Sequence, residues 1–160
     1  MKLFYFGLFH SKLSYGIVCW GGAYANKIQP LLVLQKSIVR KICNADYRSH
    51  SLELFKCTNI LPVRHLFYFK VLKSFFSEKQ RLLSNMYPHY NFRTVDNIEV
   101  PPFRTTAYRN SYPILSRRLF NKLPSGIKSL NSFNLYQKST KTWLFNFNLQ
   151  RIESLLLPDI

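Results

Sequence analysis

Acidic residues are scarce in this chain. Its 160 residues include 7 aspartates and glutamates against 23 lysines and arginines, which gives a formal net charge of +16. Between Val100 and Ile152 there is no acidic residue at all. The closest acidic pair, Asp96 and Glu99, falls in a stretch without periodicity, whereas two-metal phosphoryl chemistry needs carboxylates held on rigid elements. The sequence therefore predicts no metal site.

Recognisable catalytic motifs are also missing. The five glycines are dispersed, so there is no glycine-rich phosphate loop, and neither G-x-S-x-G nor H-E-x-x-H occurs. The four histidines lie far apart with no acid at a helical step, which favours surface or core histidines over ligands or general bases. We therefore expect a chain that is not an enzyme on its own, with no cofactor and no small-molecule substrate.

Cysteines are few. Cys19, Cys43 and Cys57 are far apart, odd in number and without a C-x-x-C pair, so neither a zinc site nor a disulfide framework is predicted. Each is expected to be a small buried hydrophobe in a reducing compartment. No apolar run approaches the length of a membrane span, and no small-residue cleavage site follows the apolar N-terminal run. The expected protein is soluble or peripheral and intracellular, in the nucleus, the cytoplasm or both.

Apolar and aromatic residues are plentiful, at 47% and 16%, which indicates a packed core. They recur at steps of three and four over residues 3–20, 27–43, 63–77 and from 132 onward, the spacing of helix faces. We predict a mainly α fold, a small bundle of about four main helices with a long irregular connector and a short β-hairpin near 104–115. The predicted parts are a helical region over 1–77, the connector over 78–103, and a basic C-terminal segment with a closing helix over 104–160.

The segment 27–43 has the clearest helical pattern. Its predicted apolar face consists of Leu31, Leu34, Ile38 and Ile42, widened by Leu32, Val39 and Cys43. Asn26 is the predicted N-cap, and Pro30 is expected in the first turn, where a missing N–H costs least. The glycine pair at 21–22 is expected to end the preceding helix in the left-handed conformation.

The excess of positive charge predicts an anionic partner. Self-repulsion at this charge destabilises a compact fold unless counterions or a polyanion relieve it. Nucleic acid is the first candidate and an anionic membrane surface the second. Aromatic residues are interleaved with bases in the acid-free stretch, a combination that holds single-stranded nucleic acid by stacking and backbone contacts. The predicted binding residues are Lys36, Arg40, Lys41, Tyr108, Arg109, Arg117 and Arg118.

An alternative interpretation places these rings in the core. Periodicity favours that alternative for Phe120, Phe133 and Trp143. For Tyr108, Arg109, Arg117 and Arg118, the core and binding interpretations both stay open.

Several segments resemble one family when taken in order. They are LFHSKLSYG at 8–16 followed by Trp20-Gly21, LQK at 34–36, RKI at 40–42, ILP at 60–62, Arg104-Thr105, LFNKLP at 119–124, Ile127-Lys128 and Ser132-Phe133. This series resembles the C-terminal region of reverse transcriptases from non-LTR (LINE-type) retrotransposons. The family commonly has Gly-Pro, two residues, then Trp-Asn in the closing segment, where this chain has Ser116-Arg117 and Phe120.

The resemblance implies a piece of an RNA-directed DNA polymerase without its catalytic part. The fingers and palm, with their metal-binding aspartates, would precede Met1, and residues 1–77 would correspond to thumb-like helices that grip template and primer. The implied partners are RNA or an RNA–DNA hybrid, held by the backbone, and the missing polymerase core. Two alternatives stay open: a decayed mobile-element fragment with no selected activity, and a basic protein that binds membrane surfaces.

Overall fold

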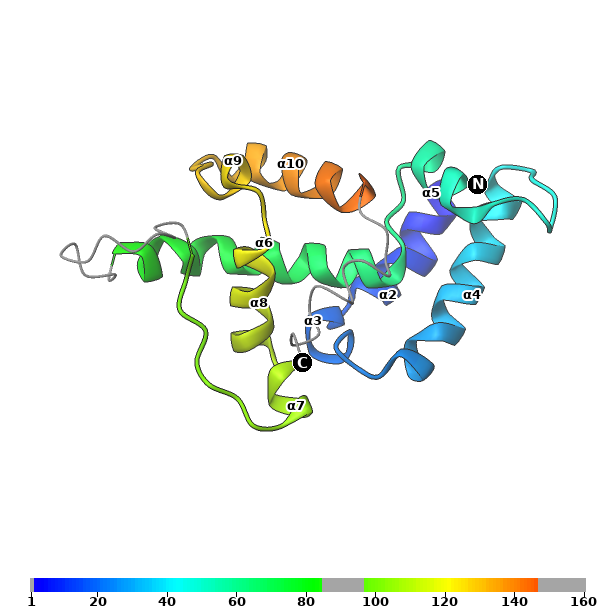
Figure 1. The fold of residues 1–160 in the computed structure, drawn as a ribbon. Helices are drawn as coiled ribbons and strands as arrows, with labels where there is room; N and C mark the ends of the chain where they lie inside the picture. Colours follow the sequence, from blue (N-terminus) through cyan, green and yellow to red (C-terminus); the bar gives the residue numbers. More distant parts are fainter. Residues whose placement is uncertain (1, 85–96, 147–160) are drawn as a thin grey trace. The chain divides into compact units, whose positions relative to one another are not determined.

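A computed structural model describes residues 2–84 and 97–146. These residues form helices and no strands, which confirms the prediction of a mainly α fold (Figure 1). Contacts divide the chain into two compact units, Met1–Phe67 and Tyr68–Ile160. The boundary falls inside the longest helix, α6 (Val63–Ser84).

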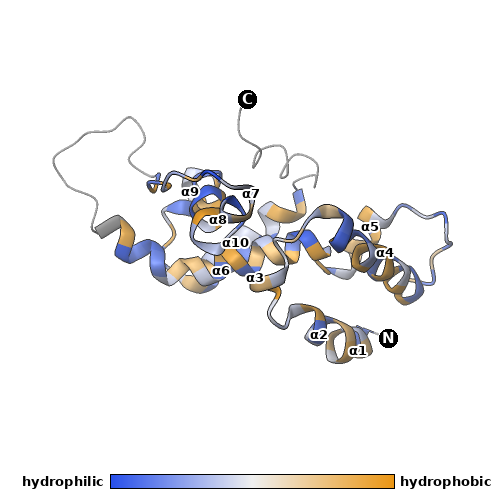
Figure 2. Ribbon diagram, turned by 90° about the horizontal axis from the view of Figure 1, so that it is seen from below, coloured by the Kyte–Doolittle hydropathy of each residue, from blue (hydrophilic) through white to orange (hydrophobic). Residues whose placement is uncertain are grey.

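The first unit contains the helices before α6 and its first turn. They are α1 (Lys2–Phe4), the π-helical segment η1 (Tyr5–His10), α2 (Ser11–Ser14), α3 (Ile17–Trp20), α4 (Ala25–Ile42) and α5 (Ser51–Thr58). Tyr5, Val39, Phe55 and Ile60 form its buried centre, so η1, α4 and α5 share one core. Apolar residues recur along α1 and α4 in Figure 2. α5 ends at Asn59, whose φ of 58° is the left-handed conformation that closes many helices.

Helix α4 confirms the predicted helix, but its buried face is centred differently from the prediction. Its buried residues are Ile28, Leu32, Gln35 and Val39. Leu34, predicted at the centre of the apolar face, is exposed. The apolar pattern was centred wrongly because a polar residue, Gln35, occupies the middle of the buried face.

The start of α4 also differs from the prediction. Tyr24, not Asn26, is the N-cap, and its carbonyl accepts from the N–H groups of Lys27 and Ile28. Pro30 therefore lies inside the helix rather than in its first turn. There it removes one helical hydrogen bond that an ordinary residue would donate.

The single helix predicted over 3–20 is broken. Tyr15 is extended, with ψ of 121°, and Gly16 has a φ of 58°, so α2 and α3 are separate helices. The predicted left-handed stop at Gly21-Gly22 is wrong, because among the described glycines only Gly16 has a positive φ. Gly21 is right-handed, and a Cβ there would collide with the Phe67 ring and lie 2.5 Å from the carbonyl of Ile17. Close packing, rather than backbone conformation, therefore requires this glycine.

The prediction that all three cysteines are buried is also wrong. Cys19 and Cys57 are exposed, and Cys43 is half-buried at the edge of the core. Cys19 falls two residues after the buried Ile17, on the side of α3 that the core does not cover. All three are free thiols.

The second unit contains the rest of α6 and the helices after it. They are α7 (Thr106–Arg109), α8 (Tyr112–Asn121), α9 (Ser125–Lys128) and α10 (Phe133–Asn146). Three aromatic contacts tie them to α6. The ring centres of Phe75 and Phe120 lie 5.6 Å apart, and that of Phe76 lies 4.9 Å from that of Tyr136 and 5.3 Å from that of Phe133. Burial of Phe120 stabilises the unit by about 2–3 kcal/mol, and it confirms the core interpretation of this residue.

The predicted β-hairpin near 104–115 is wrong, since this stretch forms α7 and the start of α8. Thr105 Oγ1 accepts a hydrogen bond from the Tyr108 N–H at 3.2 Å, which caps α7. Ser111 is the N-cap residue of α8, and Pro113 follows in its first turn. Two helix-start signals therefore outweigh the weak alternation of apolar residues.

The predicted connector, 78–103, contains three kinds of segment. Residues 78–84 continue α6, residues 85–96 lie outside the described part, and residues 97–103 form neither helix nor strand. The closing helix is present as α10, and the part of its predicted face at Phe147 also lies outside the described residues. Tyr136, Thr140 and Leu144 form the buried side of α10, while Phe133 is exposed.

Candidate nucleic-acid interface

The predicted binding residues fall into two groups. Lys36, Arg40 and Lys41 lie on α4 in the first unit. The other four, Tyr108, Arg109, Arg117 and Arg118, lie on α7 and α8 in the second unit.

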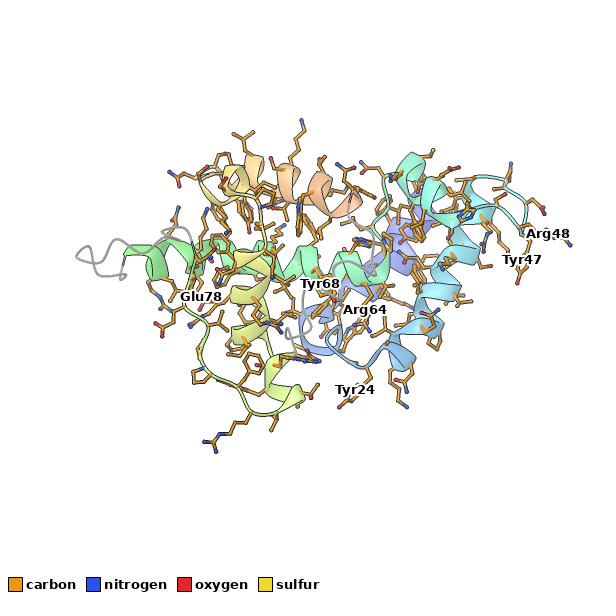
Figure 3. The ribbon with its side chains drawn as sticks, in the orientation of Figure 1. Tyr24, Tyr47, Arg48, Arg64, Tyr68 and Glu78 are labelled. Carbon is orange, nitrogen blue, oxygen red and sulfur yellow. The ribbon has the colours of Figure 1, made fainter. Side chains whose placement is uncertain are left out.

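On α4, Arg40 has a structural role that the sequence did not indicate. Its Nε and Nη2 donate to the carbonyl of Ser49 at 3.4 and 3.3 Å, and its guanidinium lies 5.6 Å from the centre of the Tyr47 ring. Arg40 therefore fastens the loop after α4. Figure 3 shows Tyr47 and Arg48 on this loop, directed away from the helices.

The two lysines of α4 are less engaged. Lys41 is exposed and Lys36 is half-buried. Both Arg40 and Lys41 stand in the last turn of the helix, where the helix dipole favours positive charge. This group offers a small basic surface without a cavity.

The charge of Arg109 on α7 affects the ionisation of Arg118 on α8. Both are half-buried, and the Nε of Arg109 is buried without a hydrogen-bond partner. Burial lowers the pKa of Arg118, and the positive charge of Arg109 lowers that pKa further. Part of the positive charge on α7 and α8 is therefore shielded from water.

Arg117 and Arg118 are oriented by the segment before α7. Nη1 of Arg117 donates to the carbonyl of Glu99 at 3.2 Å, and the Arg117 Nε is buried without a partner. The guanidinium of Arg118 lies 5.5 Å from the centre of the Phe103 ring, a cation–π contact. Both arginines therefore have restricted side chains.

Residues 97–103, called here the strap, are fastened to α8 and α9. The side chain of Asn121 bonds to Ile98 twice: Oδ1 accepts from the N–H at 2.8 Å, and Nδ2 donates to the carbonyl at 2.8 Å. Nζ of Lys128 donates to Asn97 Oδ1 at 2.7 Å and to the carbonyl of Asn121 at 2.9 Å. The strap in turn places Glu99 and Phe103 beside the arginines of α8. Sequence reasoning missed Asn121, because nothing in its local sequence distinguishes it from a surface asparagine.

Lys79 is a second residue that sequence reasoning missed. It is only 1% exposed, and its Nζ donates to the carbonyls of Lys128 at 3.0 Å and Leu130 at 2.7 Å. The ammonium lies 4.7 Å from the Phe76 ring centre and 5.2 Å from that of Tyr136. Burial lowers its pKa. Lys79 therefore binds the end of α9 and is not a surface cation.

Tyr108, on α7, lies at the surface. It is 47% exposed, while its backbone is held by Thr105 at the N–H and by the Ser111 hydroxyl, which donates to its carbonyl at 2.6 Å. The ring is thus presented on a fixed backbone. This exposure favours the binding interpretation of Tyr108 over the core interpretation.

An open apolar groove is present in the first unit. It has a volume of about 700 Å³ and is lined by Leu8, Phe9, Lys12, Leu13, Tyr15, Gly16, Cys19, Trp20 and Leu31. Neighbouring apolar side chains are also exposed, among them Leu3 and Phe4. No charged residue other than Lys12 lines this groove, so it is a surface for apolar groups.

Neither a metal cluster nor a membrane span is found in the part of the chain that the structure describes. Over residues 2–84 and 97–146, no three side chains among His, Cys, Asp and Glu lie together as a metal site would require. None of the described helices combines the length and apolarity needed to cross a bilayer.

Comparison with known proteins found no match: no family model, no curated protein and no solved structure corresponds to this chain.

Proposed function

We propose that this chain is the non-catalytic C-terminal region of a non-LTR retrotransposon reverse transcriptase, and that it binds RNA or an RNA–DNA hybrid through the nucleic-acid backbone. The ordered series of family-like segments from residue 8 to residue 133 supports the origin. The helical fold is compatible with thumb-like helices. The excess of 23 basic over 7 acidic residues supports a polyanionic partner.

One observation carries the binding proposal: the arginines of α7 and α8 are partly buried, and the positive charge of Arg109 lowers the pKa of Arg118. Between residues 97 and 146 the only acidic residue is Glu99, and it is the backbone carbonyl of Glu99 that Arg117 contacts. Guanidinium groups bind phosphate oxygens through paired N–H donors, and they are more weakly hydrated than ammonium groups. We therefore expect phosphate groups to bind the arginines of α7 and α8 in preference to water.

The test is binding of the full chain to a labelled 20-nucleotide RNA and to the matching RNA–DNA hybrid, followed by fluorescence anisotropy. Neutralising about four phosphates gives a slope of about −3 to −4 in a plot of log affinity against log salt. The proposal therefore expects affinity to fall by about a hundredfold between 50 and 200 mM salt. Affinity that is independent of salt would contradict backbone binding.

The exposed apolar residues of the first unit favour a second candidate, binding to an anionic membrane surface. Leu3 is 87% exposed and Phe4 71% exposed, and Lys2 and Lys12 are nearby in the sequence. Basic amphipathic segments of this kind lie in the membrane interface. Co-sedimentation with vesicles containing phosphatidylserine, but no binding to RNA, would favour this candidate.

The same exposed residues are compatible with a decayed fragment that has no selected activity. An uncovered apolar groove promotes self-association. A chain that sediments as one species and unfolds cooperatively would contradict this alternative.

A further inference from the structure

The loop between α4 and α5, residues 43–50, is fastened to α4 at both of its ends. The N–H of Ala45 donates to the carbonyl of Arg40 at 3.0 Å, and the preceding Asn44 is left-handed, with a φ of 49°. At the other end, Nε and Nη2 of Arg40 donate to the carbonyl of Ser49 at 3.4 and 3.3 Å. The residues between these contacts are therefore held in a defined conformation, and an ordered loop loses less entropy when it binds a ligand.

Tyr47 lies in the middle of this loop and is 85% exposed. The guanidinium of Arg40 lies 5.6 Å from the centre of the Tyr47 ring, a cation–π contact that orients the ring. Figure 3 shows the side chain directed away from the helices. Bases of single-stranded nucleic acid stack on aromatic rings that are presented to solvent in this way.

Positive charge beside this ring is not used by the fold. Arg48 follows Tyr47 and is exposed, and Lys41 is exposed in the last turn of α4. Over residues 2–84 and 97–146, the side chains of Arg48 and Lys41 make no hydrogen bond or ion pair. A guanidinium group binds phosphate through paired N–H donors, and each base of a nucleic-acid strand has a phosphate on either side along the chain. An exposed ring followed by an unpaired guanidinium therefore matches the chemistry of one nucleotide.

One acidic residue, Asp46, also lies in this loop. Its Oδ1 accepts the Tyr47 N–H at 2.7 Å, so it helps to hold the backbone at the ring. Its negative charge would nevertheless repel a phosphate that binds beside Tyr47. The site therefore predicts that removal of this charge strengthens binding, provided that the hydrogen bond is kept.

We propose that the loop 43–50 is a contact point for single-stranded nucleic acid, in which Tyr47 stacks on an unpaired base and Arg48 binds a phosphate next to that base. This inference rests on the proposed nucleic-acid binding function, and it names a site in the first unit and the strand form. It distinguishes a defined site from a diffuse field of positive charge, in which every exposed cation would contribute equally.

The experiment measures binding of the full chain to a labelled 12-nucleotide oligouridylate and to a 12-base-pair RNA duplex at one fixed salt concentration. Tyr47→Leu is expected to weaken binding to the single strand about tenfold and to leave binding to the duplex unchanged, because paired bases cannot stack on the ring. Tyr47→Phe keeps the ring and is expected to bind within about twofold of the wild type. Tyr24→Leu is the matched control, because Tyr24 is 69% exposed at the opposite end of α4. It is expected to weaken binding no more than about twofold.

Charge variants test the phosphate contact. Arg48→Gln is expected to weaken binding to the single strand about fivefold, whereas Lys27→Gln, at an exposed cation in the first turn of α4, is expected to weaken it no more than about twofold. Asp46→Asn keeps the Oδ1 acceptor and is expected to strengthen binding about threefold. Glu53→Gln, at an exposed acid of α5, is its control and is expected to change binding by less than about 1.5-fold.

The outcomes separate this inference from the proposed function. Circular dichroism establishes that each variant is folded, and Asp46→Asn, which changes neither size nor shape, keeps the test valid if Tyr47→Leu unfolds. If the wild type binds and the variants at 46, 47 and 48 behave like their controls, the loop site is wrong while backbone binding stands. Equal losses on single strand and duplex in Tyr47→Leu would overturn the stacking contact. If the wild type binds neither nucleic acid, both proposals fail.

Discussion

At the scale of single residues, the amide of Gln35 lies in the buried centre of the first unit. Its Nε2 donates to the Tyr5 hydroxyl at 2.8 Å and to the carbonyl of Leu61 at 2.9 Å, and its Oε1 accepts from the N–H of Val63 at 2.9 Å. Three segments that are distant in the sequence are thereby joined by one side chain. Because the residue is 0% exposed, water cannot replace any of these bonds.

Gln35→Met is therefore expected to be strongly destabilising. The thioether has a similar size but leaves the Val63 N–H, the Leu61 carbonyl and the Tyr5 hydroxyl without their partner, at a cost of roughly 3 kcal/mol in the free energy of unfolding. Gln29→Met is the control, because Gln29 is exposed on the same helix, and its expected cost is below about 0.5 kcal/mol. Unfolding in urea measures the free energy of unfolding of both variants. Equal midpoints for the two variants would show that the buried hydrogen bonds do not stabilise the fold.

The lowered pKa of Lys79 predicts that the free energy of unfolding depends on pH. Burial lowers its pKa in the folded state, so between that pKa and the ordinary lysine value the unfolded chain binds more protons than the folded chain. The contribution of Lys79 to the free energy of unfolding therefore rises with pH on the alkaline side of neutrality. We expect the destabilisation caused by Lys79→Met to increase from pH 7 to pH 9.5 in urea unfolding. Lys56→Met, at an exposed lysine, controls for the lost charge. A difference that shrinks with pH would contradict this role.

The buried tyrosines predict the opposite trend at higher pH. Burial raises the pKa of Tyr5 and of Tyr136, so above about pH 10 the unfolded state releases protons that the folded state keeps. Stability is therefore full below the ordinary tyrosine pKa and falls above it. Tyr136→Phe should make this alkaline fall shallower. Absorbance of tyrosinate at 295 nm measures the effect, and ionisation of all tyrosines before unfolding would contradict it.

At the scale of elements, the turn between α3 and α4 depends on Gly21. A Cβ there would meet the Phe67 ring and the Ile17 carbonyl, and the carbonyl belongs to the backbone and cannot rotate away. Gly21→Ala is expected to cost roughly 2–4 kcal/mol. Gly126→Ala is the matched control, because nothing lies within 4 Å of an added Cβ. Thermal unfolding compares the two, and an unchanged midpoint for Gly21→Ala would show that this contact is absent.

Periodicity predicted the long helices and failed where polar residues decide the structure. The helix over 27–43 was placed to within two residues, yet its buried face was centred wrongly because Gln35 occupies a core position. Residues 104–115 alternate weakly like a strand, but Thr105 and Ser111 begin helices there. The hydrogen-bond partners of Gln35 are distant in the sequence, so a one-dimensional pattern does not represent them. The cap at Thr105 is local and could have been recognised as a helix-start signal.

The candidate site was predictable in composition but not in arrangement. The absence of acids between Val100 and Ile152 identified Arg109, Arg117 and Arg118 as residues of interest. It could not show that Arg40 fastens a loop, nor that Lys79 is buried among aromatic rings. Side-chain contacts between segments distant in the sequence separate the structural cations from the surface ones.

At the scale of the whole molecule, a charge of +16 on a helical chain destabilises the compact fold unless counterions or an anionic partner compensate it. The structure shows that part of this charge is used internally, by Arg40, Lys79 and Lys128. The remainder lies on exposed cations and on the half-buried arginines of α7 and α8. A polyanion that follows this surface would relieve the repulsion within the fold as it binds.

The central claim is that this chain binds nucleic acid by neutralising backbone phosphates, and the salt dependence of RNA binding tests it most directly. For a single strand each neutralised phosphate contributes about −0.7 to the slope of log affinity against log salt. The account predicts a steep slope for the wild type and a shallower slope in the double variant Arg109→Gln/Arg118→Gln. A wild-type slope near zero would contradict it.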